Sequence, residues 1–164
     1  MIFSLSRQSH GAANAVALEL DEGVSLHWEL LDEPPADALL TAAVDLDPGV
    51  EWLMRRDRVD FPPGGIAYRH THPGPGIRYL LFGSIRIESA GETHQYGPSE
   101  PWFESGPEPV YAAAAETERT AFVRVMLLPE EWRGQRTIRY VDPADEEKPK
   151  LQRAQIFLEQ PISR

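Results

Sequence analysis

Short segments of alternating hydrophobic and polar residues run through the chain, and most of them end at a proline or a glycine. Alternation with a period of two residues is typical of β-strands that bury one face. Residues 77–82 are apolar almost throughout, as in a strand buried on both faces. The pattern predicts strands at residues 24–31, 52–61, 66–72, 77–82, 84–88, 93–96, 102–104, 110–112, 120–128, 137–141 and 154–158.

One segment has a different character. Residues 36–44 are rich in alanine and leucine and precede a turn at residues 47–49, so we expect a short helix there. Elsewhere, 15 prolines and 12 glycines separate runs rich in Val, Ile, Tyr and Phe, which favours many short strands over long helices. The predicted fold class is therefore all-β. A chain of 164 residues without a long linker is expected to form a single domain, residues 1–164.

The charge of the chain excludes some partners. It contains 26 acidic and 16 basic residues, which gives a formal net charge of −10. A nucleic-acid backbone would be repelled, so we expect no nucleic-acid partner. No stretch approaches the roughly 18 apolar residues that a membrane span requires, and the N-terminus does not resemble a signal peptide. We expect no membrane partner and a cytoplasmic location.

Candidate chemistry is concentrated at two histidines. His70 and His72 are two residues apart, so on a strand both imidazoles point to one face, with Tyr68 beside them. Neutral imidazole is a good ligand for Fe, Mn, Ni, Cu and Zn, and the absence of cysteine restricts any metal site to histidine, carboxylate and water. The spacing alone is equally compatible with two hydrogen-bonded histidines in a polar barrel mouth.

The sequence around these histidines resembles the first motif of the cupin family. That motif consists of Gly, five residues, His-x-His, a short gap, Glu, six residues and Gly, and Gly64 and Gly83 occupy its ends. Residues 97–107 resemble the start of the second motif. The resemblance covers about residues 61–126. It implies a double-stranded β-helix, a jelly-roll barrel, with its core at about residues 52–128. Because no long linker divides the chain, we expect the terminal segments to pack on this barrel or on a partner subunit. The resemblance also implies a homodimer and one divalent metal ion bound by three histidines and a glutamate.

Two positions depart from the cupin pattern. The motif's glutamate falls on Gly76, and its third histidine falls on Pro109 or Val110, neither of which binds metal. Candidate replacements are Glu104, Glu108, Tyr111 and His94. Glu108 lies nearest to the missing histidine and would complete a set of two histidines and one carboxylate, although an exposed glutamate in a turn is the competing interpretation.

Arg78 is expected either to line the cavity or to pair with a carboxylate, because an unpaired guanidinium in an apolar strand is costly. Arg124 raises the same question. The first functional hypothesis is a metal-dependent enzyme, of oxygenase, isomerase or lyase type, that acts on a small organic acid or aromatic compound. In the alternative, a non-catalytic ligand binder or sensor has lost the metal, and His70, His72, Tyr68 and Arg78 hold a small-molecule ligand by hydrogen bonds.

Overall fold

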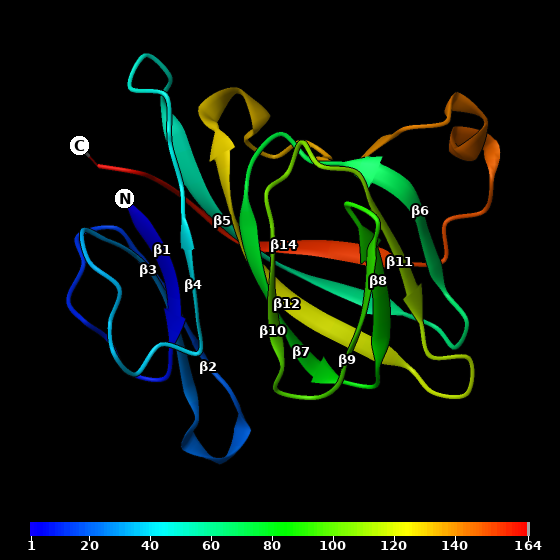
Figure 1. The fold of residues 1–164 in the computed structure, drawn as a ribbon, viewed down its shortest axis with the longest axis horizontal. Coiled ribbons are helices and arrows are strands. Elements are labelled where there is room, and N and C mark those ends of the chain that lie inside the picture. The colour runs from blue at the N-terminus through cyan, green and yellow to red at the C-terminus, as the bar shows by residue number, and fades with distance from the viewer. Residues whose placement is uncertain (164) are drawn as a thin grey trace.

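The computed structural model describes residues 1–163, which form three antiparallel β-sheets (Figure 1). The N-terminal sheet has the order β2-β3-β1-β4. Its strands are β1 (Ile2–Ser6), β2 (Ala15–Glu19), β3 (Ser25–Leu31) and β4 (Leu40–Ala43). Short 3₁₀ helices are the only helices among the described residues: η1 (Asp21–Gly23), η2 (Glu130–Trp132) and η3 (Pro143–Glu147).

Two five-stranded sheets face each other and form the barrel. The first has the order β10-β7-β12-β5-β14 and contains β5 (Trp52–Phe61), β7 (Gly76–Phe82), β10 (Pro101–Glu104), β12 (Thr120–Pro129) and β14 (Arg153–Pro161). The second has the order β13-β6-β11-β8-β9 and contains β6 (Ile66–Thr71), β8 (Ile85–Ser89), β9 (Glu92–Tyr96), β11 (Val110–Ala114) and β13 (Arg139–Tyr140). The predicted all-β fold with a barrel of two facing sheets is confirmed.

Alternation along β12 separates the interior of the barrel from its outer face. Phe122 packs with residues of both barrel sheets in the interior, and Arg124 lines the cavity. Val123 and Val125 point the other way and pack with Phe3 and Trp28 of the N-terminal sheet. The N-terminal sheet therefore covers the outer face of the first barrel sheet, and the alternation expected for residues 120–128 is confirmed.

The prediction of a helix at residues 36–44 is wrong. Residues 40–43 form strand β4, which pairs with β1 so that Leu40 lies opposite Leu5. Leu39 and Leu40 pack against the apolar cluster between the N-terminal sheet and the barrel. Backbone pairing with β1 and burial of these leucines outweigh the modest helix propensity of alanine and leucine. Among the described residues, no helix is long and apolar enough to cross a membrane.

Candidate functional site

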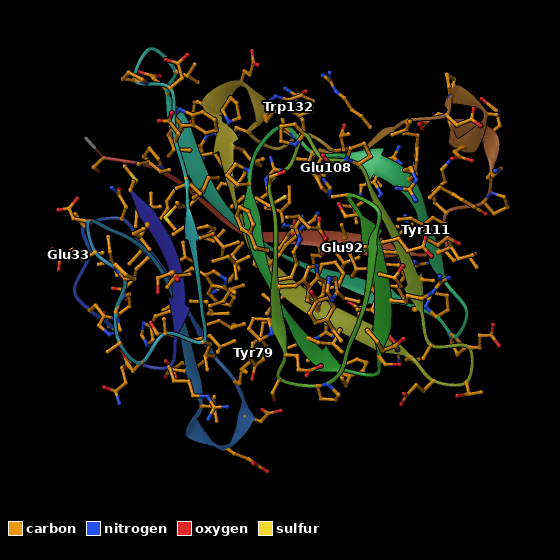
Figure 2. The ribbon with its side chains drawn as sticks, in the orientation of Figure 1. Glu33, Tyr79, Glu92, Glu108, Tyr111 and Trp132 are labelled. Atoms are coloured by element: carbon orange, nitrogen blue, oxygen red, sulfur yellow. The ribbon has the colours of Figure 1, made fainter. Side chains whose placement is uncertain are left out.

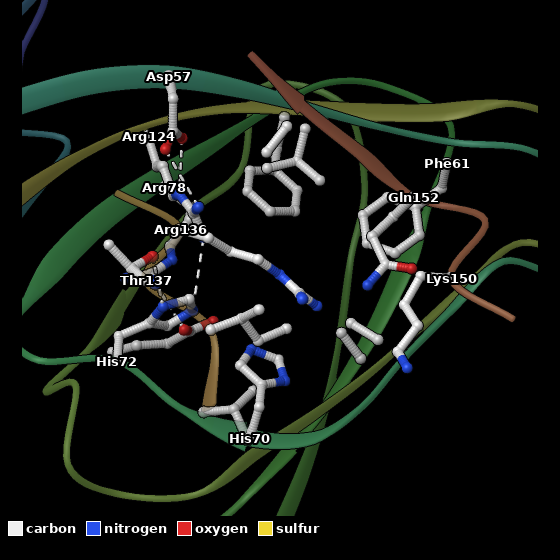
Figure 3. Close-up of a pocket in the computed structure, with 18 of the residues that line it drawn as sticks. Asp57, Phe61, His70, His72, Arg78, Arg124, Arg136, Thr137, Lys150 and Gln152 are labelled. Atoms are coloured by element: carbon white, nitrogen blue, oxygen red, sulfur yellow. Dashed lines mark hydrogen bonds and ion pairs between the residues drawn. The ribbon is translucent and has the colours of Figure 1, made fainter. Parts of the chain in front are cut away.

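A cavity of about 610 Å³ lies between the two barrel sheets and extends under the segment that joins β12 to β14 (Figure 3). Apolar side chains from both sheets form one part of its wall: Val59, Phe61, Ala67, Ile87, Trp102, Val110, Ala112 and Phe122. Charged and imidazole side chains form the other part. The volume is in the range of ordinary small-molecule sites.

His70 lies in the cavity as a neutral imidazole with a fixed tautomer. Its Nδ1 is 2.6 Å from the carbonyl oxygen of Tyr68, so Nδ1 carries the proton and donates it. Burial lowers the pKa of His70, an effect that the Glu104 carboxylate only partly offsets. The unprotonated Nε2 has no hydrogen-bond partner among residues 1–163 and is available as an acceptor.

His72 is held between two protein groups. Its Nδ1 is 3.0 Å from Oγ1 of Thr137, and its Nε2 is 3.4 Å from Nη1 of Arg124. A guanidinium can only donate, so Nε2 accepts and Nδ1 carries the proton. Burial and then the Arg124 charge hold the pKa of His72 well below its usual value.

Arg124 and Asp57 form a buried ion pair in the cavity wall, where they lie opposite each other on β12 and β5. Nε of Arg124 is 2.6 Å from Oδ1 of Asp57, and Nη2 donates to Oδ2 at 3.1 Å. The two side chains are 9% and 2% exposed. Figure 3 shows this pair directly beside His72.

Arg78 lines the cavity and is paired at the same time. Its Nη1 donates to the carbonyl oxygen of Gly76 at 2.7 Å, and its Nη2 is 2.7 Å from Oε2 of Glu104. The contact with Glu104 is an ion pair that does not meet hydrogen-bond geometry, so Nε and Nη2 are buried without a hydrogen-bond partner among the described residues. Burial lowers the pKa of Arg78 to about 10, which leaves it cationic at pH 7. Glu104 also accepts from the indole of Trp102 at 2.8 Å.

Tyr68 is not among the residues that line the cavity, which corrects the expectation that it lies beside the imidazoles. Val110 pairs with His70 but Ala112 pairs with Ala67, so three residues of β6 span the distance of two on β11. This β-bulge breaks the alternation and sends Tyr68 to the outside, where its ring lies 4.7 Å from Nζ of Lys148.

The candidate replacement metal ligands do not come together beside His70 and His72. Glu108 lies on the loop between β10 and β11, is exposed, and is not a cavity-lining residue (Figure 2). His94 is 58% exposed and pairs with Glu92. Tyr111 lies under Arg86 and also does not line the cavity. Glu104 does line it, but its carboxylate is bound by Arg78 and Trp102.

A divalent metal ion does not fit these side chains. An ideal Cβ on Gly76, the position of the missing glutamate, would lie 2.7 Å from Nη1 of Arg78, so a guanidinium occupies that space. The register places Val110, not Pro109, beside His70 and in the cavity wall, at the position of the missing histidine. His72 already accepts from Arg124. Among residues 1–163, no three His, Asp or Glu side chains are grouped to hold a metal.

Purified protein is therefore expected to carry far less than one equivalent of Fe, Mn, Ni, Cu or Zn after expression in metal-supplemented medium. Two arginines repel a cation at this site, and one imidazole lone pair is engaged. Elemental analysis of the wild type beside a His70→Ala, His72→Ala variant tests this. If the wild type contained about one equivalent of metal and the double variant did not, the conclusion that a metal ion does not fit this site would be overturned.

Several cavity residues were not identified from the sequence. Asp57 had a usable signal, because it lies two and four residues before the apolar Val59 and Phe61 and therefore shares their strand face, which lines the cavity. Thr137 precedes the short strand β13. Lys148 and Lys150, the only two lysines of the chain, also line the cavity, and their isolation in one segment was the available signal.

No protein-family model and no curated protein matches the sequence significantly. Solved structures with similar folds include the polyketide cyclase RemF from Streptomyces resistomycificus, with 21% identity and a TM-score of 0.44 over 58% of this chain and 64% of that chain. An RmlC-like cupin from Shewanella frigidimarina has 15% identity and a TM-score of 0.42 over 53% and 83%. The DMSP lyase DddQ from Ruegeria pomeroyi has 14% identity and a TM-score of 0.48 over 84% and 57%. The matched regions thus span less than two thirds of RemF and of DddQ.

Proposed function

We propose that this cupin-fold protein is a metal-independent binder of a small organic acid with an apolar body. The observation that carries the proposal is the charge of the cavity. Six of the 16 basic residues line it, against three acidic residues, in a chain of net charge −10. The six are Arg55, Arg78, Arg124, Arg136, Lys148 and Lys150, and the three are Asp57, Glu104 and Glu146. Such an excess attracts an anion into a site with low-dielectric walls.

The inner groups suit a carboxylate. Guanidinium groups bind carboxylates through paired hydrogen bonds. In Arg124, Nε and Nη2 donate to Asp57 and Nη1 contacts His72, which engages three of its five N–H groups and leaves one on each of Nη1 and Nη2 for a ligand. Arg78 lies on the neighbouring strand with donors that lack a well-formed partner, and an acceptor in the cavity would stabilise them. Nε2 of His70 accepts a hydrogen bond from an O–H or N–H of the ligand.

The remaining wall suits an apolar body. Trp102 contacts Phe122 edge to face at a centroid distance of 5.2 Å and stacks on Tyr96 at 5.0 Å, which holds both cavity rings rigidly. Ala67 and Ala112 on the opposite sheet are small and leave room in front of these rings. An aromatic or branched aliphatic group therefore fits beside the carboxylate.

Calorimetric titration with 3-phenylpropionate and its uncharged amide tests the proposal. We expect saturable binding of the carboxylate, with the amide at least about tenfold weaker, because a charge-assisted hydrogen bond contributes roughly 1.5–3 kcal/mol. An Asp57→Asn, Arg124→Gln variant, which removes both charges of the buried pair, should bind the carboxylate roughly 10- to 100-fold more weakly.

The matched control is Arg58→Gln, because Arg58 is on the same strand but pairs with Asp60 and does not line the cavity. It should bind like the wild type. Equal affinity for the acid and the amide, or no binding of either, contradicts the proposal.

A further inference from the structure

A second group of cations lines the same cavity. Arg136, Lys148 and Lys150 belong to the segment that leaves β12, forms β13 and η3, and returns as β14. Figure 3 shows Lys150 and Gln152 on the opposite side of the cavity from Asp57, Arg78 and Arg124. In this view Lys150 lies across the cavity from the arginines of the barrel wall, and the side chain of Arg136 extends between them.

Arg136 and Lys150 have weak, local partners, whereas Lys148 is paired with the buried Asp145. Nη1 of Arg136 is 3.2 Å from Oε1 of Glu146, and these side chains are 56% and 55% exposed. Lys150 donates to the carbonyl oxygen of Glu146 and lies over the ring of Tyr140 at 4.9 Å. Exposed ion pairs contribute little to stability, so an anion in the cavity can take their place at small cost. The inner arginines, by contrast, are fixed by buried carboxylates.

Apolar side chains line the cavity beside these cations. Phe61, Ala67 and Ala112 line the cavity without offering a hydrogen bond from their side chains. A ligand with one charged end can form an ion pair with only one cationic group, whereas a ligand charged at both ends can form one with each.

On the basis of the proposed function, we infer that the ligand is a dicarboxylic acid whose two carboxylates are joined by an apolar body. One carboxylate binds at Arg124 and Arg78, and the other binds at Arg136 and Lys150. The side chains of Arg136 and Lys150 are long and flexible, so the outer site recognises charge more than shape, while the inner site fixes the orientation of the ligand.

Two matched probes test this inference: 1,4-phenylenedipropionate, a dianion, and its monoamide, which has the same shape and one carboxylate. We expect the wild type to bind the diacid at least tenfold more tightly. An Arg136→Gln, Lys150→Gln variant, which leaves the Lys148–Asp145 pair intact, should bind the diacid no more tightly than the monoamide. An Arg119→Gln control removes an exposed charge outside the cavity lining and should keep the preference.

The outcomes separate the two proposals. Equal affinity of the wild type for the diacid and the monoamide overturns the inference, and so does a preference that survives in the Arg136→Gln, Lys150→Gln variant. In either case, dependence of binding on Arg124 would leave the proposed function standing. If neither probe nor 3-phenylpropionate binds, the proposed function itself fails. Circular dichroism of each variant verifies that the fold is retained.

Discussion

Asp57→Asn is expected to lower the free energy of unfolding by about 3–5 kcal/mol, the usual cost of leaving one member of a buried ion pair without its partner. The carboxylate receives two hydrogen bonds from Arg124, at 2.6 and 3.1 Å, and both side chains are almost fully buried. Without it, the guanidinium stays cationic in a cavity wall that already contains Arg78 and Arg55. Urea unfolding followed by circular dichroism measures the loss.

Comparison with two further variants shows how much of that loss comes from the unpaired buried charge. Replacing both partners, Asp57→Asn with Arg124→Gln, should recover most of the stability, because two neutral amides no longer require charge compensation. Asp60→Asn breaks the exposed pair with Arg58 on the same strand and should cost less than about 1 kcal/mol. If Asp57→Asn costs no more than Asp60→Asn, the buried pair does not support the cavity wall.

The barrel was predictable because its signals are local. Alternation along residues 120–128 and the apolar run at 77–82 each identified a strand, and Pro and Gly marked the turns between them. The placement of His70 and His72 in the cavity wall also followed from their spacing, although the bulge at Tyr68 means that His70 shares its face with Ala67 and not with residue 68. A bulge is a property of the pairing between two strands, so the sequence of one strand does not reveal it.

The nature of the site was harder to predict than its position. The sequence showed that Gly76 lacks a carboxylate, but only the structure shows that Arg78, two residues later on the same strand, directs Nη1 into that space. Likewise, the choice between Pro109 and Val110 depends on the register between β11 and β6. Both facts depend on tertiary geometry. The sequence predicts an incomplete metal site, whereas the structure shows a site with buried guanidinium groups.

His10 illustrates the same limit outside the barrel. No sequence context singled it out, yet its imidazole lies 3.2 Å from Glu29 and 2.8 Å from Asp37. The hydrogen bond to Asp37, and then that to Glu29, raises the pKa of His10. Glu29 is fully buried and also accepts from the backbone amides of His10 and Ala12, so these contacts order the loop between β1 and β2. Partners that lie 19 and 27 residues away leave no local signal.

Gly74→Ala is expected to lower the free energy of unfolding by about 3 kcal/mol or more, through a clash that the barrel cannot relieve by moving a side chain. An ideal Cβ at this position would lie 1.9 Å from the carbonyl oxygen of Leu127, which belongs to the backbone of β12. The loop from His72 to Gly76 is held at this distance by two hydrogen bonds. The amide of His72 donates to the carbonyl oxygen of Gly106 at 2.8 Å, and that of Leu127 donates to Pro75 at 2.8 Å.

The same clash should also disturb the ligand site, because the loop begins at His72 and ends at Gly76, which both contact arginines of the cavity wall. Retreat of this loop by the ångström or more that a methyl group needs would weaken the contact between Arg124 and His72 and the one between Arg78 and Gly76. We therefore expect weaker binding of 3-phenylpropionate even where the variant is folded. Gly49→Ala is the matched control, since its nearest neighbour is the flexible carboxylate of Asp47 at 3.2 Å. Equal unfolding free energies for these two alanine variants would show that the loop from His72 to Gly76 moves without cost. In that case, the close packing of this loop would not be what holds His72 against Arg124.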